Sequence, residues 1–193
     1  MKQFLLAFIL SIQILFAQQN KQGSNVVVID RSLKNIEVLV KEIKPGTKVV
    51  FFNNSSDILA FITSAVKTHK PVNSLHIVTH GEAGKLLFAN KELTGDMIEE
   101  SELILGTWKE CFMPGGDILI YGCEVGKGSR GIGFVNSFAV RTGIDIAASE
   151  NDTGAELQGG DWSLELHSGK IESSHIFSRK ARETYPALLK RTK

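Results

Sequence analysis

Short apolar runs alternate with helical patterns along most of this chain, and the alternation predicts an α/β domain. The runs are nearly continuous, as expected for strands buried on both faces, and they cover residues 26–30, 49–52, 75–79, 117–121 and 144–149. Between them, apolar residues recur at helical spacing over 33–43, 58–66 and 134–140. This order favours a three-layer α/β/α sandwich built on a mainly parallel sheet.

Four segments add detail to this outline. Residues 85–88 and 91–93 flank Ala89-Asn90, which predicts a β-hairpin directly after the third strand. A helix capped by Thr94 or Asp96 is expected to run towards Cys111. Alternating residues at 162–166 predict an edge strand or a hairpin arm. The last apolar positions, 176–189, predict a closing helix that Pro186 disturbs.

The N-terminus has the pattern of a secretory signal peptide. Lys2 precedes an apolar stretch over 4–16, and Ala17 stands before a polar segment over 18–24. The stretch is shorter than the ~20 residues of a membrane span, although an uncleaved anchor is an alternative. We therefore expect a signal peptide at 1–17, a single domain over 25–190, a secreted or periplasmic location, and no membrane span after cleavage.

Charge and cysteine content exclude several classes. The 22 basic and 21 acidic residues leave a net charge of +1, so the sequence offers no electrostatic case for binding nucleic acid. Cys111 and Cys123 lie on either side of the fourth strand, and about seven strand residues span roughly 23 Å. Since bridged cysteines need Cα atoms within about 7 Å, we expect two free thiols.

The candidate chemistry lies just past two strand ends. His80-Gly81 follows the strand at 75–79, and Gly122-Cys123 follows the strand at 117–121. Neighbouring parallel strands lie about 4.8 Å apart, and ligands bind at the carboxyl ends of such strands. The pattern predicts a thiol nucleophile at Cys123 and an imidazole acid/base at His80. The backbone N–H groups of Gly81 and Cys123 would hold the oxyanion.

These features resemble the caspase–clostripain–gingipain superfamily of cysteine peptidases. The shared points are a strand ending in His80-Gly81, an immediate hairpin, and a strand ending in a small residue and Cys123. From 26–30 to Tyr185 the chain is also similar to a bacterial family of domains of unknown function, number 4347, often found at the front of large secreted, adhesin-like proteins. The likeness implies a caspase-like sheet and peptidase activity, although the superfamily usually has alanine where Gly122 stands.

The same resemblance implies a specificity pocket near the fifth strand, where Ser149, Glu150 and Asp152 lie. An acidic pocket would favour Arg or Lys before the scissile bond; alternatively, Asp152 caps the turn that follows it. Asp30 ends the first strand at the same sheet edge, and it either lines the cleft or caps the following helix.

Other chemistries have little support in the sequence. The glycines between 126 and 133 lack the Walker spacing, His167 and His175 lack a metal-ligand pattern, and Cys-x-x-Cys is missing. We therefore expect no cofactor and no metal. The preferred hypothesis is a secreted cysteine endopeptidase acting on a polypeptide substrate. The alternative is a catalytically silent module on the same fold that binds a surface protein.

Overall fold

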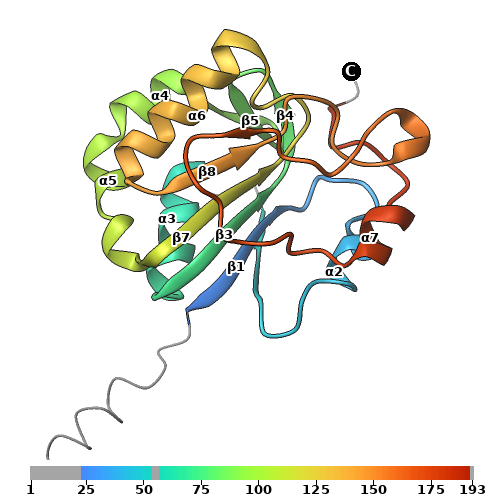
Figure 1. Cartoon of the computed structure of the whole chain (residues 1–193), viewed down its shortest axis with the longest axis horizontal. Helices are drawn as coiled ribbons and strands as arrows, with labels where there is room; N and C mark the ends of the chain where they lie inside the picture. Colours follow the sequence, from blue (N-terminus) through green and yellow to red (C-terminus); the bar gives the residue numbers. More distant parts are fainter. Residues whose placement is uncertain (1–22, 54–56, 192–193) are drawn as a thin grey trace, which may run out of the picture.

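The computed structural model describes residues 23–53 and 57–191 (Figure 1). The predicted signal peptide at 1–17, and the polar segment up to residue 22, lie outside the described residues. The two cysteines are free, as the spacing argument predicts.

A six-stranded sheet with the order β2-β1-β3-β7-β8-β9 forms the middle layer. Its first five strands are parallel, and the short last strand is antiparallel to β8. The predicted apolar runs therefore form a mainly parallel sheet, which confirms the fold class. The strands are β1 (Ser24–Asp30), β2 (Lys48–Phe52), β3 (Val72–Val78), β7 (Phe112–Tyr121), β8 (Asp145–Ala148) and β9 (Leu166–His167).

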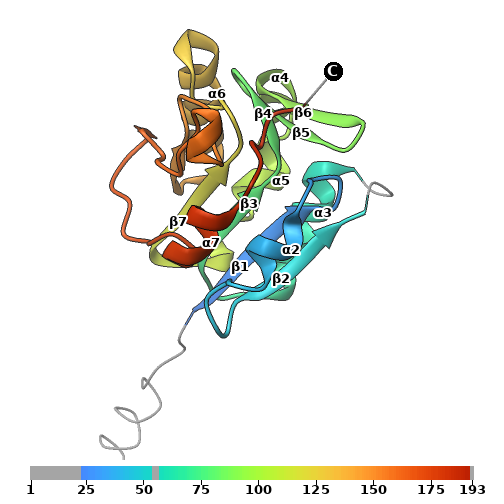
Figure 2. The ribbon, with the colours of Figure 1, turned by 90° about the vertical axis from the view of Figure 1, so that its right-hand side faces the viewer.

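Helices cover both faces of this sheet, as Figures 1 and 2 show. Alternate strand residues enter two separate cores: Val28 and Ile120 pack on one side, whereas Ile29 and Leu119 pack on the other. The first core includes residues of α3 (Ile58–Thr68), α4 (Gly95–Glu100), α5 (Glu102–Gly106) and α6 (Gly128–Thr142). The second includes residues of α2 (Ile36–Val40) and α7 (Arg179–Thr184).

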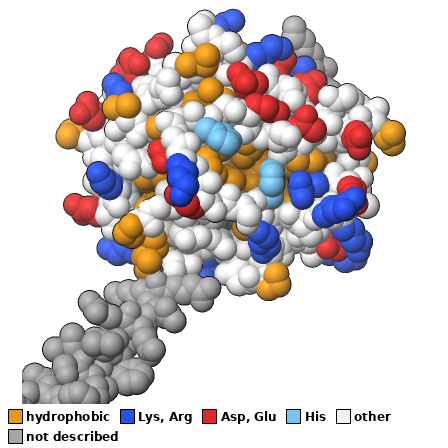
Figure 3. Space-filling view, in the orientation of Figure 1, with side chains coloured by type: hydrophobic (Ala, Val, Ile, Leu, Met, Phe, Trp, Pro, Cys, Tyr) orange, Lys and Arg blue, Asp and Glu red, His pale blue; other side chains and the backbone are white. Residues whose placement is uncertain are grey.

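Aromatic side chains fill much of this second layer, where the helices are short. Trp162 lies at its centre, with ring centroids 5.5 Å from Phe177, 5.6 Å from Tyr185 and 6.2 Å from Tyr121. Apolar side chains remain visible in the middle of this face, with histidines beside them (Figure 3). Loop residues thus supply burial that helices supply on the other face.

The predicted hairpin is present and is part of a three-stranded antiparallel sheet. Its strands are β4 (His80–Glu82), β5 (Lys85–Phe88) and β6 (Lys91–Thr94). Ala89 begins the turn between β5 and β6 with φ of 49°, a value that is uncommon for a residue with a side chain. The Thr79 hydroxyl donates to the Leu87 carbonyl oxygen at 2.6 Å, which fastens this small sheet to the end of β3.

Three helix predictions and one strand prediction need correction. The helix expected over 33–43 is confined to Ile36–Val40, and the one leading to Cys111 is divided into α4, α5 and the 3₁₀ turn η1 (Lys109–Cys111). Of the edge strand predicted at 162–166, only Leu166 lies in a strand, the two-residue β9 (Leu166–His167) at the edge of the sheet. A second 3₁₀ turn, η2 (Glu156–Gln158), lies in the loop before it.

The closing helix predicted over 176–189 is the largest error. Only Arg179–Thr184 is helical, and Tyr185 is already extended with φ −65° and ψ 122°. Pro186 explains the end of the helix, because a proline ring excludes the helical conformation of the residue before it and cannot donate a backbone hydrogen bond. The extended chain after Tyr185 passes along the sheet edge where the candidate site lies.

Candidate active site

His80 and Cys123 lie at the ends of neighbouring parallel strands, as the sequence predicts. Strands β3 and β7 pair in register, with Val78 opposite Tyr121. The Thr79 N–H continues the pairing by donating to the Tyr121 carbonyl oxygen at 3.1 Å. Both turns therefore leave the sheet at the same edge and at the same level.

The two turns touch through their backbones, and this contact requires a glycine. A Cβ atom on Gly81 would lie 2.6 Å from the Cys123 carbonyl oxygen and 2.5 Å from Val125 Cγ2. Real Cβ atoms do not approach other atoms so closely, so only glycine fits at position 81 without a shift. The close packing brings the N–H groups of Gly81 and Cys123 near each other.

These two N–H groups converge on one oxygen atom. Gly81 N–H donates to the Leu189 carbonyl oxygen at 3.3 Å, and Cys123 N–H donates to the same oxygen at 3.4 Å. They are the two groups that the sequence predicts as oxyanion donors. A peptide carbonyl from the chain's own C-terminal part thus lies where such donors would bind a carbonyl oxygen.

The carbonyl belongs to residues 186–191, which we call the C-terminal segment. It pairs antiparallel with residues 153–155 through an isolated bridge between Gly154 and Leu188. The Ala155 N–H donates to the Ala187 carbonyl oxygen at 2.9 Å, and the Leu189 N–H donates to the Thr153 carbonyl oxygen at 2.8 Å. Figure 2 shows this red segment rising past β3 towards the small sheet.

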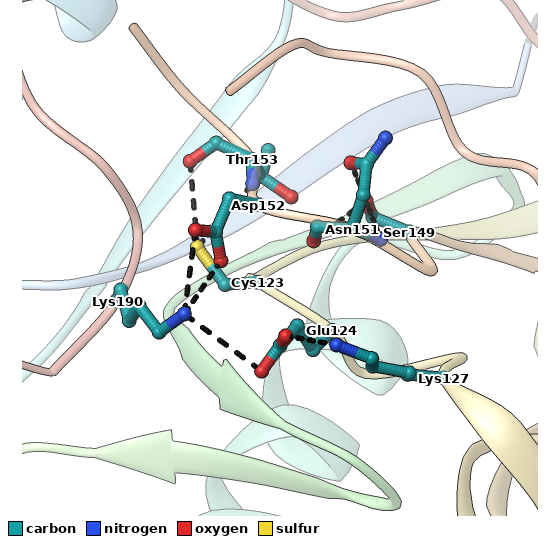
Figure 4. A network of polar contacts seen from close by, with 8 residues as sticks. All are labelled: Cys123, Glu124, Lys127, Ser149, Asn151, Asp152, Thr153 and Lys190. Atoms are coloured by element: carbon teal, nitrogen blue, oxygen red, sulfur yellow. Dashed lines mark hydrogen bonds and ion pairs between the residues drawn. The ribbon is translucent and has the colours of Figure 1, made fainter. Parts of the chain in front are cut away.

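Cys123 lies beneath the C-terminal segment, and its side chain has no exposed surface. The thiol donates to the Thr153 carbonyl oxygen at 3.6 Å, and Thr153 N–H donates to the sulfur at 3.3 Å (Figure 4). The pKa of this thiol is raised to about 12, mainly by burial; the Thr153 backbone opposes the rise, and the charge of Asp152 adds to it. With the segment in place, the thiol is neutral.

His80 is partly buried, and burial lowers the pKa of its imidazole. The Leu189 backbone and the Asp30 carboxylate act in the opposite direction. Within the described chain, Nδ1 of His80 has no hydrogen-bond partner, and no hydrogen bond joins the imidazole to the Cys123 sulfur. The imidazole lines a cavity of about 680 Å³ beside the C-terminal segment. Other residues lining this cavity are Ser32, Lys34, Asn35, Ala89, Gln158, Pro186, Ala187, Leu188, Lys190 and Arg191.

The side chain of Lys190, the residue after Leu189, lies near two carboxylates. Lys190 Nζ lies 3.0 Å from Asp152 Oδ1 and 3.9 Å from Glu124 Oε2 (Figure 4). Glu124 follows Cys123 directly, and its φ of 61° puts it in the left-handed region that residues with side chains rarely adopt. The hydrogen bond that Lys190 donates to Asp152 is the main cause of the raised pKa of Lys190. The Lys190 cation therefore lies between two carboxylates at this end of the site.

Of the four predicted pocket residues, Asp152 contacts the C-terminal segment. Asp30 is buried, and its carboxylate accepts from the N–H groups of Ser32 and Ala89 at 2.9 and 2.8 Å, as a turn residue does. Ser149 is buried, and its hydroxyl donates within the loop at 150–152. Glu150 is exposed, and its N–H donates to Glu165. The structure therefore gathers His80, Cys123, Gly81 and Asp152, and the charge of Asp30 also acts on His80. Ser149 and Glu150 make their contacts elsewhere.

Sequence reasoning missed Glu124, Thr153 and the C-terminal segment as parts of the site. The Tyr185-Pro186 pair is a local signal that the chain becomes extended. Nothing local signals that this extended piece pairs with residues 153–155, because the partners are more than 30 residues apart. A left-handed glutamate after Cys123 also has no sequence signature.

Metal and membrane features are not found in the described part of the chain. Residues 23–53 and 57–191 contain no cluster of three or more His, Cys, Asp or Glu side chains suited to a metal ion. None of the helices in these ranges is both long and apolar enough to cross a bilayer.

Comparison with known proteins gives a family but no activity. Residues 26–189 match the profile of a family described as a domain of unknown function, DUF4347. No functionally curated protein matches the sequence. A solved structure described as a small-chain dehydrogenase is 9% identical, with a TM-score of 0.36, and the match covers 64% of this chain and 79% of the other. So remote a likeness does not bear on function.

Proposed function

We propose that this chain, which belongs to the DUF4347 family of domains of unknown function, is a cysteine endopeptidase. Cys123 is the nucleophile, His80 is the general acid/base, and the N–H groups of Gly81 and Cys123 hold the oxyanion. One observation carries the proposal: both N–H groups donate to a single peptide carbonyl oxygen, that of Leu189, and one of the two donors belongs to Cys123 itself. Paired donors of this kind are what acyl transfer requires.

The reaction divides into two steps. The Cys123 sulfur attacks the carbonyl carbon of the substrate, the thiol proton passes to His80, and the developing oxyanion accepts from Gly81 and Cys123. His80 then protonates the leaving amine, which gives a thioester and a free N-terminus. Water attacks the thioester with His80 as the base, which releases the carboxylate and restores the thiol. The resemblance to caspase-like peptidases agrees with this assignment.

The thiol must leave its present environment before it can react. Its pKa of about 12 arises mainly from burial, although the Lys190 charge of the C-terminal segment lowers it, and a neutral thiol is a poor nucleophile. Displacing the segment would admit water to this edge of the sheet, and solvation of the thiolate lowers the pKa of a buried thiol. The structure thus corresponds to a latent form of the proposed enzyme.

A secreted or periplasmic location belongs to the same proposal. It depends on the signal-peptide pattern at 1–17, which lies outside the described residues. The substrate would then be a polypeptide in the same compartment.

A second candidate function is a silent binding module for a surface protein. The complete burial of Cys123 favours it, because the thiol and both backbone donors would then only hold the C-terminal segment in place. In that case the residues at this edge are structural, and substituting them alters stability without altering any cleavage.

Digestion of a peptide library separates the two candidates. Cys123→Ala and His80→Ala should each abolish cleavage, because they remove the nucleophile and the proton carrier. Cys111→Ala is the matched control, since Cys111 is also a buried free thiol but lies at the opposite end of β7. The comparison includes a Lys190→Glu background, in which the C-terminal segment is loosened. Absence of cleavage in both backgrounds would refute the peptidase and leave the binding module.

A further inference from the structure

We infer that the C-terminal segment lies in the site as a substrate does, and that it identifies the substrate class. This class is an extended polypeptide, bound as an added β-strand, with a leucine before the scissile bond and a basic residue after it. The inference rests on the proposed function, because it assigns the ligand of the same site.

The backbone of the segment is bound as an added strand. The Ala187 carbonyl oxygen accepts from the Ala155 N–H, and the Leu189 N–H donates to the Thr153 carbonyl oxygen. Between them, Leu188 forms an antiparallel β-bridge with Gly154. Residues 153–155 thereby offer alternate hydrogen-bonding groups to an extended peptide, a common mode of peptide recognition. The pairing ends where the Leu189 carbonyl oxygen accepts from the Gly81 and Cys123 N–H groups, so the register brings one peptide bond, Leu189–Lys190, to the two oxyanion donors.

The absence of a side chain at Gly154 lets the backbone of an added strand lie close to residues 153–155. Gly154 has φ of 134°, and a Cβ atom there would lie 2.3 Å from the Ala187 carbonyl oxygen and 2.9 Å from Leu188 Cα. A residue with a side chain would therefore keep any strand out of this position. Gly160 plays a similar part, since its Cβ atom would lie 2.5 Å from Leu188 Cδ2.

The side chain before the scissile bond enters an apolar environment. Leu189 has no exposed surface, and it belongs to the buried cluster that includes Val78, Trp162 and Tyr185. A charged side chain in this place would lose its water without gaining a partner. The site therefore selects a leucine, or an apolar side chain of similar size, at this position.

The residues after the scissile bond meet polar groups. Lys190 binds Asp152 at 3.0 Å and lies 3.9 Å from Glu124. Arg191 donates to the Ala89 carbonyl oxygen at the turn of the hairpin. The acidic pocket expected from the caspase-like resemblance thus binds a basic residue after the scissile bond rather than before it.

The first experiment tests whether the segment covers the thiol. Lys190→Glu replaces the ion pair with Asp152 by repulsion, and the exposed side chain of Lys190 makes misfolding improbable on structural grounds. Iodoacetamide labelling of Cys123, followed by peptide mass spectrometry, should become up to about fivefold faster than in wild type, even though the substitution also removes a cation that lowers the pKa of the thiol. Lys170→Glu is the matched control, because it reverses a comparable exposed ion pair with Glu172. Equal labelling of Cys123 in all three proteins would overturn the inference.

The second experiment tests the substrate class. A peptide with the sequence of residues 185–191, acetylated and amidated, is added to the Lys190→Glu protein. It should slow the labelling of Cys123 and be cleaved between its Leu189 and Lys190 equivalents. Versions carrying Leu189→Asp or Lys190→Glu should protect about tenfold less.

The outcomes separate this inference from the peptidase proposal. Protection without cleavage supports the assigned ligand but refutes the peptidase. Cleavage of other library peptides without protection by this one supports the peptidase but overturns the assigned substrate class. Equal protection by the three peptides would also overturn the substrate class.

Discussion

Gly81→Ala is the substitution with the sharpest structural prediction. The added methyl group would lie 2.5 Å from Val125 Cγ2, 2.6 Å from the Cys123 carbonyl oxygen and 2.9 Å from the Gly122 carbonyl carbon. Two of these three neighbours are backbone atoms, which a change of rotamer cannot move. The turn at Gly81 must therefore move away from the turn at Cys123.

The size of the effect follows from the distances. Ordinary contacts of a Cβ atom begin near 3.4 Å, so the turns must separate by several tenths of an ångström or more. Overpacking of this kind typically lowers the free energy of unfolding by 1–3 kcal/mol. Because two of the three contacts here are with backbone atoms, we expect a loss near the upper end, about 3 kcal/mol. The Gly81 N–H now lies 3.3 Å from the Leu189 oxygen, so the same movement lengthens that bond past useful range. Losing one oxyanion donor costs about 10²–10³ in kcat.

Urea denaturation and peptide cleavage measure the two effects in a series of three variants. Gly133→Ala is the control, because Gly133 is an exposed position within α6 and its Cβ atom would meet nothing within 4 Å. It should stabilise the protein by up to about 1 kcal/mol. Gly122→Ala should be intermediate, since its Cβ atom would lie 3.1 Å from the Thr79 oxygen. With an m value of 1–3 kcal/mol/M, Gly81→Ala should lower the urea midpoint by roughly 1–3 M.

The order of stability is the decisive result: Gly133→Ala, then wild type, then Gly122→Ala, then Gly81→Ala. A Gly81→Ala protein as stable as wild type would refute the account of the touching turns. A stable protein that also cleaved peptides at the wild-type rate would further remove Gly81 from the proposed oxyanion site.

Two further predictions concern stability. Burial lowers the pKa of His76 to about 3. Below about pH 6.5 the unfolded chain therefore binds a proton at His76 that the folded chain does not bind. As the pH falls from 6.5 to 3, the free energy of unfolding should decrease by up to ~1.4 kcal/mol per pH unit. His76→Gln should flatten this slope in urea titrations at several pH values, and an unchanged slope would contradict the assignment. Trp108 is fully buried and donates to Thr63 Oγ1 at 3.0 Å; Trp108→Phe should cost about 2–4 kcal/mol by thermal or urea denaturation, whereas a loss below about 0.5 kcal/mol would show that neither packing nor the hydrogen bond matters.

The sequence by itself determined the sheet and the location of the candidate site. Strands buried on both faces must be apolar at nearly every position, so β1, β3 and β7 are visible as continuous runs. Residues following such strands necessarily emerge at the carboxyl edge, which is why His80 and Cys123 could be placed together. The hairpin after His80 could also be predicted from a local pattern, since two short strand patterns flank a two-residue turn.

Only the tertiary structure decided what covers that edge. The apolar residues at 185–189 suit a helix, a strand or a buried coil equally well, and local periodicity cannot say which distant backbone they pair with. Pro186 ends the helix locally, but the added strand exists because residues 153–155 have unpaired hydrogen-bonding groups at the correct distance. The Cys123 sulfur contacts Thr153, and its burial raises the pKa of the thiol; these contacts join residues 30 positions apart, and therefore no pattern within either segment could reveal them.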